Sequence, residues 1–122
     1  MDAFPLADLL DRRAASGGPW LEFVRSPDLS AGLYVIDAGG VDGQQPHTED
    51  EVYVILAGRA RFTAGTETRD VEPGDTIFVA AEVPHRFHDV RDELRIVVVF
   101  GPPEGSRALG AADRWDAETV EG

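Results

Sequence analysis

The chain has 122 residues, a formal net charge of −12, no cysteine and 43% hydrophobic residues. Its length fits one globular domain, and its negative charge argues against binding to nucleic acid or to an anionic membrane surface. The lack of cysteine excludes disulfides, thiolate metal sites and cysteine nucleophiles.

The first segment, residues 1–19, predicts one short amphipathic helix over residues 5–15. Leu6, Leu9 and Leu10 share a face there, and a Gly-Gly-Pro sequence then ends the helix. The segment lacks the positively charged start and the long apolar core of a signal peptide. No apolar run in the chain approaches the ~20 residues of a membrane helix. Together with the absence of cysteine, these features favour a cytoplasmic protein.

Short stretches rich in β-branched and aromatic residues follow over residues 20–101, with turn residues between them. We predict strands at 20–25, 32–37, 51–57, 59–64, 66–71, 75–80, 84–88 and 94–100. The third and fourth of these are expected to form a hairpin around Gly58. Seven or eight short strands at close spacing indicate an all-β sandwich or barrel with one short helix.

The last predicted strand, residues 94–100, is apolar on both faces over much of its length. Such a strand is typically buried on both sides, and we expect a second subunit to cover one side, which predicts a homodimer. Residues 102–122 begin with two prolines and then become polar and acidic. We predict that they form a partly disordered C-terminal extension, in which Trp115 could anchor part of the tail.

All three histidines, His47, His85 and His88, lie near the starts of two predicted strands. Alternation along extended chain places Gln45 with His47, and it separates His85 from His88. If Glu51 faces the same interior, two imidazoles and one carboxylate converge in the arrangement that leaves open positions on a divalent metal. Gln45 could add an amide oxygen. The alternative is a pair of buried, hydrogen-bonded histidines without a metal, with Glu51 exposed to water.

These residues also fit the first motif of the cupin superfamily, G-x5-H-x-H-x3-4-E-x6-G. Gly39, His47, Glu51 and Gly58 stand at the required spacing, and Gln45 replaces the first histidine. The chain therefore resembles small single-domain cupins.

The second cupin motif, G-x5-P-x-G-x2-H-x3-N, is matched less completely. Gly74 and His85 agree, whereas Ala80, Glu82 and Asp89 replace the proline, the inner glycine and the asparagine. The two motifs and the strands around them cover roughly half of the chain, from Gly39 to Phe100, and the earlier predicted strands fit the same fold.

The resemblance implies a jelly-roll β-barrel with one divalent ion, Fe, Mn, Zn, Ni or Cu, inside its mouth. The metal ligands carried over from the family are His47, Glu51 and His85, with Gln45 in the place of a fourth. Glu51 is also the candidate catalytic group, because a loosely held carboxylate can leave the metal and take a proton from the substrate. Tyr53 and Phe87 are predicted to line the substrate pocket, and Glu49 and Asp50 are interpreted as solvated loop carboxylates.

Cupins of this kind include dioxygenases, isomerases, lyases and cyclases. The resemblance therefore implies a metal-dependent enzyme that acts on a small, oxygen-rich organic substrate. A non-catalytic module that binds a metal or a small ligand is the alternative, and the replacement at Gln45 favours it. A metal-free structural subunit is a third hypothesis.

Overall fold

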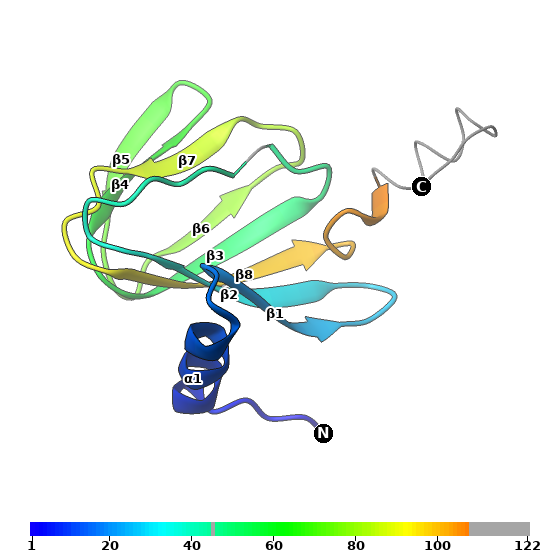
Figure 1. The fold of residues 1–122 in the computed structure, drawn as a ribbon. Helices are drawn as coiled ribbons and strands as arrows, with labels where there is room; N and C mark the ends of the chain where they lie inside the picture. Colours follow the sequence, from blue (N-terminus) through cyan, green and yellow to red (C-terminus); the bar gives the residue numbers. More distant parts are fainter. Residues whose placement is uncertain (45, 108–122) are drawn as a thin grey trace.

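Figure 1 shows the fold in a computed structural model, which describes residues 1–44 and 46–107. One helix is followed by eight strands in this part of the chain: α1 (Leu6–Ser16), β1 (Trp20–Arg25), β2 (Ser30–Ile36), β3 (Asp50–Ala57), β4 (Ala60–Ala64), β5 (Glu67–Val71), β6 (Thr76–Val79), β7 (His85–His88) and β8 (Leu94–Gly101). The prediction of a mainly β fold with one short N-terminal helix is confirmed. No helix within the described ranges is long and apolar enough to cross a membrane.

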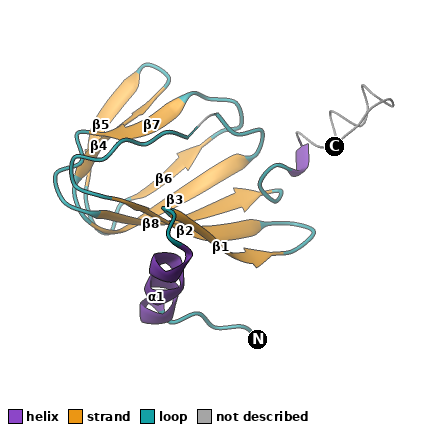
Figure 2. Ribbon diagram, in the orientation of Figure 1, coloured by secondary structure: helices purple, strands orange, loops and turns teal. Residues whose placement is uncertain are grey.

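The strands form two antiparallel sheets. Five strands pair in the order β1-β2-β8-β3-β6, and three pair in the order β5-β4-β7. The arrangement is that of a jelly roll, although the strand pairs of the described residues lie within each sheet and do not close the barrel. Figure 2 shows the two sheets as separate layers, with α1 beyond the five-stranded sheet.

The predicted hairpin around Gly58 is wrong, because β3 and β4 belong to different sheets. β3 pairs with β6 and β8, whereas β4 pairs with β5 and β7. Gly58 has a φ of 89° and carries the chain from one sheet to the other. A Cβ at this position would lie 2.2 Å from the carbonyl oxygen of Glu93. The glycine therefore marks a crossover held close to another segment and not a two-stranded turn.

The main core fills the space between the two sheets. Alternate residues of β3 and β8 point inward, as the period of two requires. The most deeply buried apolar side chains of this core are Tyr53, Ile55, Phe62, Val71, Phe87, Leu94, Ile96, Val98 and Phe100. Tyr53 and Glu51 lie on the inward face of β3, near its first residue. At this end of the strand, polar groups are therefore buried in an otherwise apolar interior.

A second, smaller core lies on the outer face of the five-stranded sheet. Leu9 of α1 packs there against Leu33 and Val35 of β2, and all three are at most 4% exposed. Leu6, which was expected on the same helix face, is 41% exposed. The helix therefore covers the sheet at β1 and β2. The outward residues of β8, predicted to be buried by a second subunit, are only half-buried in the single chain.

Candidate metal centre

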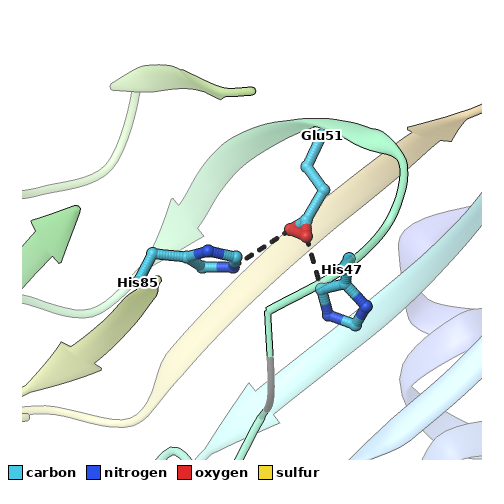
Figure 3. A group of neighbouring side chains, drawn as sticks. All are labelled: His47, Glu51 and His85. Atoms are coloured by element: carbon cyan, nitrogen blue, oxygen red, sulfur yellow. Dashed lines mark ion pairs between the residues drawn. The ribbon is translucent and has the colours of Figure 1, made fainter. Parts of the chain in front are cut away.

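Three side chains from separate parts of the chain meet where β3 and β7 begin (Figure 3). His47 Nε2 is 3.6 Å from Glu51 Oε1, and His85 Nε2 is 3.3 Å from Glu51 Oε2. One ligand atom of each residue lies within 4.8 Å of the others. The structure thus brings together three of the four residues that the sequence suggested as ligands.

Local structure explains why these three converge. Glu51 is the second residue of β3 and lies opposite Phe100 of β8, facing the interior with 1% of its surface exposed. His85 opens β7 in the other sheet, and its side chain is only 2% exposed. His47 belongs to the loop before β3 and remains 19% exposed. The cluster therefore bridges the two sheets and is open to solvent on the His47 side.

The His85 ring is oriented by its own backbone neighbourhood. Its Nδ1 is 2.7 Å from the carbonyl oxygen of Val83, which is an acceptor, so Nδ1 carries a proton and donates it. Nε2 then faces Glu51 and the hydroxyl of Tyr53, 2.8 Å away. A hydrogen bond from one imidazole nitrogen to a carbonyl is the usual way in which proteins orient a metal-binding histidine.

The cluster holds more acceptors than protons. The single hydroxyl proton of Tyr53 has two oxygen acceptors around it, Glu51 Oε2 at 2.5 Å and Gln44 Oε1 at 3.1 Å, and His85 Nε2 lies 2.8 Å from the hydroxyl oxygen. Glu51 Oε1 is buried and has no hydrogen-bond partner in the described part of the molecule. A buried, unsatisfied carboxylate oxygen is costly, and a cation between the three residues would satisfy it.

The spacing of the donor atoms also suits one metal ion. Nitrogen and oxygen ligands about 2.1 Å from a tetrahedral metal lie about 3.4 Å from each other. The separations of 3.6 Å to Glu51 Oε1 and 3.3 Å to Glu51 Oε2 are close to this value, and one ligand atom of each of the three residues lies within 4.8 Å of the others. Two imidazoles and one carboxylate are ligands for Zn, Fe, Mn, Ni and Cu. The residues present therefore fit a divalent metal.

Burial and charge shift the protonation of the groups in this cluster. Burial raises the pKa of Tyr53 strongly, and the negative charge of Glu51 raises it further. For His85, burial alone would lower the pKa, but the hydrogen bonds to Glu51 and Val83 outweigh it and the net shift is upward. Without a metal the cluster therefore retains protons, because the Glu51 carboxylate stabilises them.

The remaining predicted site residues lie in different surroundings. Phe87 is 1% exposed, and its ring packs on Tyr53 and Phe62 in the core. His88 Nε2 lies 2.7 Å from Thr63 Oγ1, away from the cluster, as its alternation with His85 predicted. Gln45 lies outside the described residues.

An amide that the sequence did not single out does reach the cluster. Gln44 Oε1 is 3.3 Å from His47 Nε2 and 3.1 Å from the Tyr53 hydroxyl. Its amide nitrogen donates to Asp42 Oδ2 at 2.7 Å, and the 7% exposed Asp42 also accepts from Tyr34 Oη at 2.6 Å. Asp42 thus fixes which end of the Gln44 amide faces the histidine. Alternation favoured Gln45 and could not reveal this loop geometry.

The chain beyond β8 returns to the site. Glu49, interpreted from the sequence as a solvated loop carboxylate, is 1% exposed. Its Oε1 accepts from the amide of Gly105 at 3.0 Å, and its Oε2 accepts from the amide of Arg107 at 3.2 Å. Ser30 Oγ accepts from the amide of Glu104 at 2.8 Å. These bonds hold residues 102–107, which we call the C-terminal strap, whereas the rest of the predicted extension, with Trp115, lies outside the described residues.

A small cavity opens beside the cluster. It has a volume of about 130 Å³ and is lined by Trp20, Tyr34, Gln44, His47, Val98, Phe100 and Glu104. Tyr53 and Phe87, the predicted pocket residues, are not among the lining residues. Glu104 of the strap places Oε2 3.8 Å from His47 Nδ1, and burial raises the pKa of its carboxyl. The cavity wall therefore comes from β1, β2, β8 and the strap, together with the loop before β3.

Comparison with known proteins supports the family suggested by the motifs. The model of the cupin domain family Cupin_2 matches residues 32–100. An uncharacterised protein of Streptomyces coelicolor is 48% identical over 104 residues, which cover 85% of this chain and 99% of that protein.

Three further matches involve a lyase, its crystal structure and the structure of a second protein. The dimethylsulfoniopropionate lyase DddQ of Ruegeria pomeroyi is 33% identical over 115 residues, which cover 81% of this chain but only 55% of DddQ. The DddQ crystal structure matches with a TM-score of 0.61 and 25% identity, over 72% of this chain and 49% of that chain. The structure of TT1209 from Thermus thermophilus matches with a TM-score of 0.65 and 24% identity, over 84% of this chain and 99% of that one. With the family model covering more than half of its length, the chain belongs to the cupin family.

Proposed function

We propose that this protein is a metal-dependent cupin enzyme of the lyase type. It would remove a proton from a carbon atom beside a carboxylate or carbonyl group of a small organic substrate. The observation that carries the proposal is the meeting of His47, Glu51 and His85 with the Tyr53 hydroxyl at one buried point.

His47, Glu51 and His85 would hold the metal, and Gln44 Oε1 lies beside them, 3.3 Å from His47 Nε2. A divalent ion bound there would attract the substrate oxygens and lower the pKa of the neighbouring C–H group. The open side of the cluster lies at His47, which also lines the adjacent cavity. A substrate can therefore enter from the cavity while Phe100 and Val98 exclude water behind it.

Tyr53 and Glu51 are the groups that could move the proton. Their oxygen atoms are 2.5 Å apart, so a proton can pass between them without movement of the backbone. In an elimination, the proton leaves the carbon for this pair and the C–H electrons form a carbon–carbon double bond. The bond to the leaving group on the next carbon then breaks, and the leaving group takes the bonding electron pair.

The likeness to DddQ favours a lyase over a dioxygenase, an isomerase or a cyclase. DddQ is a lyase by name, and this chain spans about half of it. A suitable substrate carries a carboxylate on one carbon and a leaving group on the next carbon. Such a substrate fits both a lyase reaction and the proton transfer that we propose for the cluster. Dimethylsulfoniopropionate is accordingly the first compound to test.

The test combines metal analysis with turnover. Freshly purified protein and the variants His47→Ala, His85→Ala and His88→Ala would be analysed for bound metal and assayed with dimethylsulfoniopropionate by the absorbance of the unsaturated acid formed. We expect His47→Ala and His85→Ala to lose metal and activity, whereas His88→Ala, the matched control, retains both. Equal metal content in all four proteins would refute the proposed centre.

A non-catalytic metal- or ligand-binding module is the second candidate. The sequence feature that favours it is Gln45 in the place of a family histidine. The same assay separates the two candidates. A fully metal-loaded protein that binds carboxylates but turns over none of them would support the binding module and contradict the lyase.

A further inference from the structure

Three aromatic rings form much of the wall of the cavity beside the metal cluster. The ring centroid of Trp20 is 6.2 Å from that of Tyr34 and 6.1 Å from that of Phe100, and both pairs meet edge to face. Rings at steep angles to one another surround a small space from several directions. This is the arrangement of the aromatic cages that bind methylated cations.

The backbone makes room for these rings. Trp20 of β1 lies opposite Tyr34 of β2 in the antiparallel register, so both side chains emerge on the same face of the sheet. A Cβ on Gly32 would lie 2.1 Å from Cη2 of Trp20. The indole can therefore lie over β2 only because residue 32 has no side chain.

The strap adds a negative charge to the aromatic wall. Glu104 contributes the one carboxylate among the described residues that line the cavity, and none of these lining residues is an arginine. The nearest guanidinium in the hydrogen-bond network is that of Arg25, which donates to the Glu104 main-chain carbonyl at 3.0 Å. The same group also donates to Glu22 Oε1 at 2.9 Å. The Glu104 side chain is 33% exposed and lies at the rim of the cavity. There its negative charge can offset the free-energy cost when a bound cation loses part of its hydration.

We propose that this cavity is a subsite for a small methylated cation, a quaternary ammonium or sulfonium group at one end of the substrate. His47 belongs both to the cavity wall and to the metal cluster, so one short molecule can occupy both places. A volume of about 130 Å³ suits a group of a few heavy atoms, being well below the ~300–1,000 Å³ of sites for drug-sized ligands. The position of the remainder of the substrate rests on the proposed function.

The test uses probes that lack any metal-binding group. Binding of tetramethylammonium chloride and of its neutral analogue tert-butanol would be measured by calorimetry at pH 8 on the full chain after removal of metal with EDTA. We expect tetramethylammonium to bind on the order of tenfold more tightly than tert-butanol. Because no metal is present, a failure of the metal-dependent lyase hypothesis would not change this result.

Variants of cavity residues test whether tetramethylammonium binds in this cavity. Glu104→Gln should weaken tetramethylammonium binding on the order of tenfold, whereas Glu67→Gln, which removes the same charge from exposed β5, should leave it unchanged. Trp20→Leu keeps an apolar side chain but removes the aromatic face, so it should reduce the preference for the cation over tert-butanol. Circular dichroism would show that each variant is folded. The proposal is overturned if neither probe binds, if tert-butanol binds as tightly, or if Glu67→Gln has the effect of Glu104→Gln.

Discussion

Gly58 provides a quantitative test of the crossover between the two sheets. Its φ of 89° lies in the left-handed region, which residues with a Cβ adopt only at a cost. The backbone around Glu93, in the segment before β8, passes directly against it. An alanine Cβ at this position would lie 2.2 Å from the Glu93 carbonyl oxygen, 2.7 Å from its carbonyl carbon and 2.8 Å from Leu94 Cα. Gly58→Ala is therefore expected to destabilise the fold by two separate effects.

The two effects can be estimated one at a time. The left-handed backbone costs a residue with a side chain about 1–2 kcal/mol. Relief of contacts with backbone atoms, which cannot rotate away, costs about 1–3 kcal/mol more. Alanine regains about 0.4–1 kcal/mol by restricting the unfolded chain. The net loss is about 1–5 kcal/mol, with a middle value of ~3 kcal/mol, compared with the roughly 5–15 kcal/mol by which such domains are stable.

Urea denaturation followed by circular dichroism measures this loss. With m of about 1–3 kcal/mol/M, a loss of ~3 kcal/mol should lower the midpoint for Gly58→Ala by roughly 1–3 M. Two control variants separate the causes. Gly65→Ala has a φ of 60° with open space around its Cβ and should show the backbone cost alone, and Gly18→Ala, with open space and no positive φ, should be nearly neutral. If Gly58→Ala cost no more than Gly65→Ala, the close approach of the two segments would not be a stabilising constraint on the crossover.

Three further outcomes are expected. Glu49→Ala removes the buried acceptor of two amides, so it should lower stability by about 2–3 kcal/mol and speed hydrogen exchange in residues 102–107 more than in β8. Tyr53→Phe should retain metal, as measured by elemental analysis, while the proposed lyase activity falls about 10²- to 10⁴-fold. Unchanged activity would remove Tyr53 from proton transfer. Phe78 is 63% exposed on the outer face of the five-stranded sheet, the face of the outward β8 residues, through which we propose that a homodimer forms. Sedimentation should therefore give twice the chain mass for the wild type and the single-chain mass for Phe78→Glu, and equal masses would contradict that interface.

Regular local signals made most of the fold predictable. Stretches of β-branched and aromatic residues placed the strands correctly to within a few residues, and β3 and β8 each have one face in the core. The strands that pair with β3 could not be predicted from this local pattern. Gly58 looks like a hairpin glycine in the sequence, but its positive φ serves a close approach to Glu93, which is distant in the chain. Periodicity identifies strands, and it does not tell which strands are neighbours.

The candidate site was predictable from the spacing of the first cupin motif. His47 and Glu51 stand at the spacing that this motif requires, although His47 lies in the loop before β3 and only Glu51 on the strand itself. Glu49, in the same loop, is buried because it meets the strap and not solvent. The sequence gives no sign of that partner, because Gly105 and Arg107 contribute main-chain amides, which every residue type except proline possesses. Gln44 was missed for a related reason: Asp42, outside any strand, determines its orientation.

The metal cluster and the neighbouring cavity depend on different parts of the chain. The three candidate ligands come from β3, β7 and the loop before β3, whose spacing is constrained by strand register. The carboxylate at the rim comes from the strap, which Glu49 and Ser30 hold by its main-chain amides. Main-chain anchoring leaves the side chain at position 104 free to vary without loss of those bonds. A change of charge there would therefore alter the proposed preference of the cavity for a cation while the metal cluster stays intact, so that this preference would depend on residue 104 and not on the cupin fold as such.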